Sequence, residues 1–274
     1  MQNKSSFISI FAFLICISVS IGAWAGIFSL TQNQEIQIGR QAAAQINKTT
    51  PLLNDRDVND YIDKIGRRLV RSSNRSDIPY TFRVANLSEI NAFALPGGFI
   101  YINRGLIQKS TTENELVGVM GHEIGHVVAR HSVEQIERSR KAQVGFLLFG
   151  ALLEGSGVRG GSTLFNGAQL VTQGVFLKFS RDAEREADRI GAKMVYDAGW
   201  NPNGMVTFFK KLEKEGGSGA NFFSTHPSPA ERQANISDLI SQWKNKGITD
   251  SDEFQSIRKR LATLPPSPKG TARR

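Results

Sequence analysis

The chain has 274 residues, of which 40% are hydrophobic and 22% charged, a balance typical of a folded globular domain and not of a disordered or multi-span membrane protein. Its 34 Lys and Arg exceed its 25 Asp and Glu, which gives a net charge of +9 and favours contact with anionic surfaces. The single cysteine, Cys16, lies in the targeting segment described next. Removal of that segment excludes disulfides, Cys-ligated metals and a cysteine nucleophile.

Residues 1–25 have the pattern of a signal peptide. Lys4 precedes an uncharged apolar run over residues 7–21, and the Ala-Trp-Ala sequence at 23–25 supplies the small residues that a signal peptidase reads. We therefore expect cleavage before Gly26, export, and a periplasmic or equivalent lumenal location. The alternative is an uncleaved membrane anchor, although the run is shorter than the roughly 20 residues that span a bilayer.

Apolar residues recur with helical spacing in two early segments and in two late ones. These four segments are predicted to be helices over residues 31–46, 57–70, 203–214 and 229–243. Between the early and late pairs, three short segments have strand character: residues 80–87, 91–95 and 99–102. A Pro-Gly-Gly turn joins the last two strands. Because Pro96 cannot donate a ladder hydrogen bond, we expect this hairpin at a sheet edge.

A long helix is predicted from Thr112 to about Arg140, and it carries an HExxH sequence. Residues four apart on a helix lie about 40° apart, so His122 and His126 can bind one metal ion. Glu123 lies about 100° from His122, near enough to act on a water molecule without being a ligand. In this chemistry zinc acidifies the water, and Glu123 is the general base that takes its proton for attack on a peptide carbonyl.

The third histidine of this segment, His131, falls inside the apolar arc of the predicted helix, about 140° from His126. We therefore expect a hydrogen-bonded core histidine there and not a ligand. Two histidines leave zinc one protein ligand short.

Residues 180–188, on a second helix, offer Glu184 and Glu186 as candidates for the missing ligand. Glu184 and Asp188 lie along the edge of the apolar arc of this helix, whereas Glu186 points toward a solvated face. We therefore expect Glu184 to be the ligand. Asp188 is expected to orient a zinc-binding histidine.

The HExxH sequence, followed downstream by Ser-Arg-x-x-Glu-x-x-x-Asp at 180–188, resembles the family of HtpX, the CAAX prenyl proteases and the periplasmic BepA-like and LoiP-like metallopeptidases. Three further segments match this family: residues 35–39, 91–98 and 226–229. The resemblance covers roughly residues 31–245. It implies a mostly helical α+β, zincin-like fold, whose small sheet has an edge strand flanking the active-site helix. It also implies one zinc ion per chain, with ligands His122, His126 and Glu184 and with Glu123 as general base.

Three parts are expected along the chain: a signal peptide at 1–25, a zinc metallopeptidase domain at 26–250, and a segment at 251–274 that ends in a basic, disordered tail. Unlike HtpX-type and CAAX-type members, the chain shows no transmembrane segment after the signal, and only a short tail follows the protease. We therefore expect a minimal exported member.

Residues 144–161 combine an apolar run with a glycine-rich stretch, which suits either a buried helix and flexible loop or a mobile cover over the cleft.

Residues Asn91, Ala92, Phe93 and Ala94 are the candidate edge strand for substrate, because a substrate backbone can add as a further strand beside a sheet edge. Main-chain pairing favours extended, unfolded segments, so we expect misfolded or damaged exported and membrane-associated proteins as substrates. The alternative is a purely structural hairpin.

His226, outside the HExxH helix, is expected either to occupy the fourth zinc position or to stabilise the oxyanion of the reaction. A surface loop histidine is the third alternative.

Two functions follow from these residues. The favoured one is a zinc metalloendopeptidase acting in protein quality control. The alternative is a zinc-holding, chaperone-like or binding module with little turnover. The intact Glu123 argues against this alternative.

The positive charge suits peripheral contact with an anionic membrane surface. We expect no nucleic-acid partner, because no nucleic-acid-binding motif accompanies the charge.

Overall fold

The computed structural model describes residues 29–153, 178–215, 220–227, 229–243 and 247–268. The expected signal peptide, the glycine-rich stretch 155–161 and the end of the expected tail, 269–274, lie outside the described residues. The chain divides into two compact units, one formed by residues 1–31 and 134–165, the other by residues 32–133 and 166–274.

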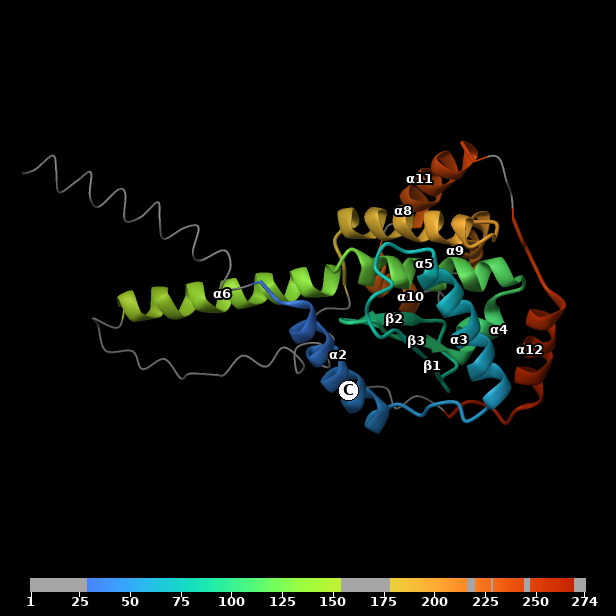
Figure 1. Ribbon diagram of the computed structural model, residues 1–274, viewed down its shortest axis with the longest axis horizontal. Coiled ribbons are helices and arrows are strands. Elements are labelled where there is room, and N and C mark those ends of the chain that lie inside the picture. Colours follow the sequence, from blue (N-terminus) through green and yellow to red (C-terminus); the bar gives the residue numbers. More distant parts are fainter. Residues whose placement is uncertain (1–28, 154–177, 216–219, 228, 244–246, 269–274) are drawn as a thin grey trace, which may run out of the picture. The chain divides into compact units, whose positions relative to one another are not determined.

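Helices dominate the second unit and surround a small sheet (Figure 1). Its elements are α2 (Gln32–Thr49), α3 (Arg56–Arg71), β1 (Thr81–Ala85), β2 (Ala92–Leu95), β3 (Phe99–Asn103), α4 (Arg104–Lys109), α5 (Glu113–Val128), α8 (Arg181–Asp197), α9 (Asn203–Glu215), α10 (Ala220–Thr225), α11 (Pro229–Ser241) and α12 (Asp252–Thr263). The mostly helical α+β fold predicted from the sequence is confirmed.

The described strands form a sheet in the order β1-β3-β2, which makes β2 an edge strand. β2 runs antiparallel to β3, and β1 pairs parallel with β3. The hairpin turn between β2 and β3 requires glycine, because Gly97 and Gly98 have φ angles of 72° and 91°. β2 also contacts α5, so the edge strand flanks the helix of the HExxH sequence, as predicted.

Helix α5 lies at the centre of this unit, with α8 along one side of it and the sheet along another (Figure 1). Glycines allow α5 and α8 to pack backbone against backbone. A Cβ on Gly125 would lie 2.5 Å from the carbonyl oxygen of Ala187, and one on Gly191 would lie 2.8 Å from the carbonyl carbon of Gly121. This close packing brings the carboxylates of α8 beside the histidines of α5.

The single long helix predicted from Thr112 to about Arg140 is wrong. α5 ends at Val128, and a separate helix, α6 (His131–Leu153), begins three residues later. The break lies at Arg130, whose φ of 60° is in the left-handed region. The side chain of Arg130 donates from Nε to Oε2 of Glu35 at 3.0 Å, a contact that links the break to α2.

Helix α6 continues through the apolar run 144–153, which is therefore helical. Within the described parts of the chain, no helix is both long enough and apolar enough to cross a membrane.

The segment after residue 250 packs onto the rest of the second unit through α12, a helix that was not predicted. The apolar side chains of Phe254, Ile257 and Leu261 are buried. The buried guanidinium of Arg104 donates to the carbonyl oxygens of Leu261 at 2.7 Å and Pro265 at 2.6 Å, so it caps the end of α12. The described part of this segment is thus held by specific contacts.

Asp55 caps α3 and provides a stability test. Its side chain accepts from the backbone N–H of Val58 and pairs with Arg260 on α12 at 2.8 Å. The hydrogen bond from Arg260 outweighs burial and holds the pKa of Asp55 below its ordinary value. A carboxylate with a lowered folded-state pKa stabilises the fold above its unfolded-state pKa and loses this effect as pH falls through the folded-state pKa.

Asp55→Ala is therefore expected to lower the free energy of unfolding at neutral pH by about 1 kcal/mol, the typical value of an N-cap. The difference from wild type should shrink as the pH falls through the folded-state pKa of Asp55. Urea unfolding across this pH range checks it, with Ser251→Ala as the control, because Ser251 caps α12 in the same way without titrating. A cost for Asp55→Ala that does not change with pH would contradict the prediction.

Candidate metal centre

Four buried side chains converge at one place in the second unit. His122 and His126 come from α5, Glu184 from α8, and His226 directly follows α10. One nitrogen or carboxylate oxygen from each lies within 4.8 Å of the others. Nε2 of His122 is 3.0 Å from Nε2 of His126 and 3.2 Å from Nδ1 of His226. The same Nδ1 of His226 is 3.1 Å from Oε1 of Glu184. Three imidazole nitrogens and one carboxylate oxygen form a donor set that suits a transition-metal ion.

Each member of this cluster is fixed by its own element. His122 and His126 are four residues apart on one face of α5, and Glu184 follows the N-cap Ser180 in the first turn of α8. His226 is held by a backbone hydrogen bond to the carbonyl oxygen of Phe222 and by stacking of its ring on the Phe222 ring, 4.8 Å between centroids. His226 thus lies just beyond the end of α10.

Asp188 holds the outer nitrogen of one histidine of the cluster. Its Oδ1 lies 2.9 Å from Nδ1 of His122, which leaves Nε2 of His122 facing the other donor atoms. Burial and the charge of Arg232 oppose protonation of His122, but Asp188 and Glu184 outweigh them and raise the pKa of His122 to about 9. A carboxylate in this position fixes the tautomer and orientation of a metal-binding histidine.

Arg232, on α11, is a site residue that the sequence analysis missed. Its side chain is 1% exposed, and its guanidinium forms two 2.7 Å contacts with the carboxylate of Asp188. Nη1 lies 2.6 Å from Oε2 of Glu184, and the guanidinium sits 4.5 Å from the ring centre of Phe209. The Arg232 charge counters burial and keeps the pKa of Asp188 low. Two buried carboxylates predict a cation between them, but no local pattern distinguished Arg232 from its neighbours.

Glu123 lies beside the cluster without belonging to it. Its side chain is 1% exposed, and Oε1 is 3.4 Å from Nε2 of His226. This oxygen is buried and forms no hydrogen bond with any residue that the structure describes. A buried carboxylate oxygen without a hydrogen bond is costly, so its presence beside a donor cluster fits a site that holds a metal and a polar ligand.

The remaining candidates are placed as follows. Glu186 is 51% exposed on the other side of α8 from Glu184. His131 is buried, and its Nδ1 lies 2.9 Å from Nδ1 of His126, so it is a hydrogen-bonded histidine outside the cluster of four. Asn91 precedes the edge strand β2, which contains Ala92, Phe93 and Ala94, and the ring of Phe93 stacks on Tyr101 in β3 at 5.0 Å.

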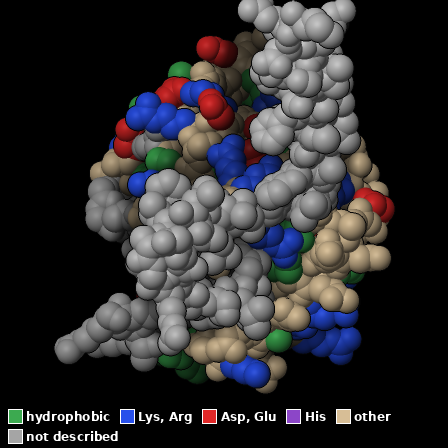
Figure 2. Space-filling view, turned by 90° about the vertical axis from the view of Figure 1, so that its left-hand side faces the viewer, with side chains coloured by type: hydrophobic (Ala, Val, Ile, Leu, Met, Phe, Trp, Pro, Cys, Tyr) green, Lys and Arg blue, Asp and Glu red, His purple; other side chains and the backbone are tan. Residues whose placement is uncertain are grey.

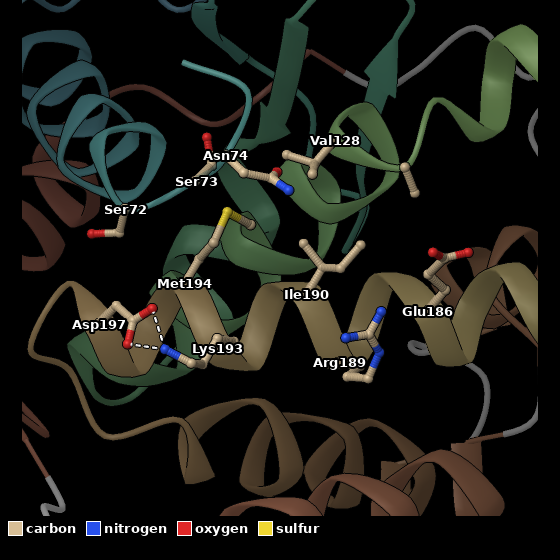
Figure 3. Close-up of a pocket in the computed structure, with 11 residues that line it drawn as sticks. Ser72, Ser73, Asn74, Val128, Glu186, Arg189, Ile190, Lys193, Met194 and Asp197 are labelled. Atoms are coloured by element: carbon tan, nitrogen blue, oxygen red, sulfur yellow. Dashed lines mark hydrogen bonds and ion pairs between the residues drawn. The ribbon is translucent and has the colours of Figure 1, made fainter.

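A cavity of about 450 Å³ lies on the face of α8 that is turned away from Glu184 (Figure 3). Ile190 and Met194 of α8 and Val128 of α5 line it together with Glu186 and with Lys193, which pairs with Asp197. It is separate from the four-residue cluster.

This fold, with an HExxH helix packed beside a glutamate-bearing helix and an edge strand, defines a zincin-like metallopeptidase domain. Residues 56–240 match Peptidase family M48, and the chain belongs to this family.

Three curated relatives place the chain within the family. It is 32% identical over 238 residues to the Beta-barrel assembly-enhancing protease of Escherichia coli, which covers 85% of this chain and 49% of that protein. It is 32% identical over 192 residues to the Mitochondrial metalloendopeptidase OMA1 of Schizosaccharomyces pombe, covering 69% of this chain and 55% of that protein. It is 30% identical over 190 residues to Metalloprotease YcaL of Escherichia coli, covering 66% and 72%. The chain thus spans about half the length of the first of these relatives.

Proposed function

We propose that this protein is a zinc-dependent endopeptidase that hydrolyses misfolded or damaged exported and membrane-associated proteins. The observation that carries the proposal is the buried convergence of His122, His126 and Glu184 beside Glu123, whose buried Oε1 has no hydrogen-bond partner among the described residues. Family membership supports the class of reaction, and the names of the relatives describe proteases and metalloendopeptidases.

In this proposal, His122, His126 and Glu184 hold one zinc ion per chain. When bound, the ion supplies Lewis-acid chemistry, which polarises a peptide carbonyl and acidifies a water molecule. Glu123 accepts the proton of that water and later delivers it to the leaving amine. Asp188 fixes the ring of His122, and Arg232 balances the charges of Asp188 and Glu184.

His226 has two roles open to it within this proposal. Its Nδ1 faces Glu184 and His122, a position that suits a fourth ligand, which would hold the enzyme idle. Its Nε2 faces Glu123 at 3.4 Å, a position that suits a donor to the oxyanion of the reaction. We favour the blocking role, because an exported protease that accepts unfolded chains needs restraint.

The substrate class follows from the edge strand β2 beside α5. A substrate segment that pairs with residues 91–94 would extend the sheet by one strand. Such pairing uses main-chain groups and reads side chains weakly, so it selects for extended conformation. The name of one relative, Beta-barrel assembly-enhancing protease, is consistent with misassembled exported proteins as substrates.

Export to the periplasm or an equivalent lumen rests on the signal-peptide pattern at residues 1–25. Contact with an anionic membrane surface rests on the net charge of +9. Figure 2 shows Lys and Arg side chains at several separate places on one face of the protein. A zinc-holding binding module is the alternative function, and Glu123 argues against it, because a binder does not need a general base.

The ligand assignment is tested by comparing two glutamates of α8 that lie two residues apart. Glu184→Ala removes a proposed ligand and is expected to lower the zinc content of purified protein far below one ion per chain. Glu186→Ala alters a half-exposed side chain and is expected to leave zinc affinity nearly unchanged. Metal analysis and competition with a chelator provide the measurements. Loss of zinc from the Glu186 variant and not from the Glu184 variant would overturn the assignment.

A further inference from the structure

His131 approaches the proposed metal centre from outside the four-residue cluster. Its Nδ1 lies 2.9 Å from Nδ1 of His126, while Nε2 of His126 faces Nε2 of His122 at 3.0 Å. This contact depends on the helix break at Arg130. In a continuous helix, His131 would lie about 140° around the axis from His126 and could not reach its ring.

Two ring nitrogens at this distance share one proton, and the orientation of His126 decides which ring carries it. A metal-binding imidazole is neutral and uses the lone pair of the nitrogen that faces the ion. Nε2 of His126 faces the cluster, so its proton resides on Nδ1 and is donated to Nδ1 of His131. His131 then has its own proton on Nε2, which faces Oε2 of the half-exposed Glu186 at 3.4 Å.

We propose that His131 is a positioning residue for the metal site: it accepts the Nδ1 proton of His126 and thereby fixes the ring orientation and tautomer of that ligand. This inference rests on the proposed zinc-binding function.

The charges of the site explain why a neutral acceptor is suitable at this position. His122 already has a carboxylate partner in Asp188, and Glu123 and Glu184 are buried nearby. A carboxylate in place of His131 would add another negative charge to this buried region, at a desolvation cost. An imidazole accepts the hydrogen bond of His126 without adding charge. The two proposed histidine ligands are thus held in different ways, His122 by an anion and His126 by a neutral ring.

The test measures zinc affinity of the full chain by competition with a chelator. His131→Leu removes the acceptor and is expected to weaken zinc binding about 10–100-fold, the usual effect of losing a partner of a metal ligand. His131→Gln keeps a carbonyl acceptor and is expected to restore most of this affinity. Val133→Ala, in the same turn of α6, is the packing control, because it removes buried apolar atoms and leaves both imidazole rings in place. It should lower thermal stability and leave zinc affinity unchanged.

Unchanged affinity in His131→Leu, or equal losses in the Leu and Gln variants, would overturn the proposal. If wild type binds no zinc, the proposed function itself fails; if wild type binds zinc and His131→Leu binds it equally well, only this inference fails. Nitrogen NMR of the wild-type, zinc-loaded protein gives a second test that needs no variant to fold. We expect a proton on Nε2 of His131 and none on its Nδ1. A proton on Nδ1 of His131 would contradict the proposal.

Discussion

Glu123→Gln is expected to bind zinc as well as the wild type does while degrading an unfolded substrate such as casein about 10²–10⁴-fold more slowly. The amide has nearly the shape of the carboxylate but cannot accept the proton of the attacking water. Glu123 is not in the cluster of four donors, so coordination should be unaffected. Metal analysis of the purified variant together with a casein degradation assay makes the measurement.

The two readouts separate the general base from the ligands. Glu184→Ala is the comparison variant, because it should lose metal and activity together. Activity of Glu123→Gln close to that of wild type would exclude Glu123 as the base. Loss of zinc from Glu123→Gln would instead mean that this carboxylate contributes to binding the metal.

Arg232→Met is expected to lower the free energy of unfolding of the metal-free protein by about 3–5 kcal/mol, the cost of leaving a buried partner uncompensated. Methionine fills similar apolar space, but Glu184 and Asp188 would lose the guanidinium that pairs with both carboxylates. A bound dication supplies part of the missing charge, so added zinc should stabilise the variant more than the wild type. Urea unfolding with zinc and with a chelator measures both effects.

Arg185→Met is the matched control, because Arg185 pairs with Glu231 and Asp182 at the exposed surface of α8. Its substitution should change stability little. If Arg232→Met is too unstable to purify, the double variant Arg232→Met, Asp188→Asn removes one buried charge of each sign and should recover part of the loss. A single Arg232→Met variant as stable as wild type without metal would show that the buried ion pairs contribute nothing to the fold.

The helices with strong apolar periodicity were predictable from the sequence, because their own residues specify both conformation and buried face. The predicted segments 31–46 and 57–70 correspond to α2 and α3, and the hairpin of β2 and β3 was identified by its Pro-Gly-Gly turn. The short helix α4 and the helices α10 and α12 were missed. α4 and α10 have six residues each, too few for a periodic pattern to show.

The parts of the site that sequence analysis missed depend on contacts between distant segments. The helix break at Arg130 carries no glycine or proline that would mark it, and it is tied instead to Glu35 on α2. The contact between His131 and His126 follows from that break. Arg232 reaches Asp188 across 44 positions of sequence, and its own neighbourhood gives no sign that its charge is buried.

The backbone packing of α5 against α8 sets how the protein responds to losing its metal. Because Gly125 and Gly191 leave no room for a side chain between the helices, the distance between the two ligand-bearing backbones is determined by van der Waals contact. The proposed ligands are thus held near one another by the fold itself, and Arg232 offsets the charge of Glu184. We therefore expect metal exchange at this site to be a local event with little reorganisation of the chain, unlike in small domains that fold only around their ion.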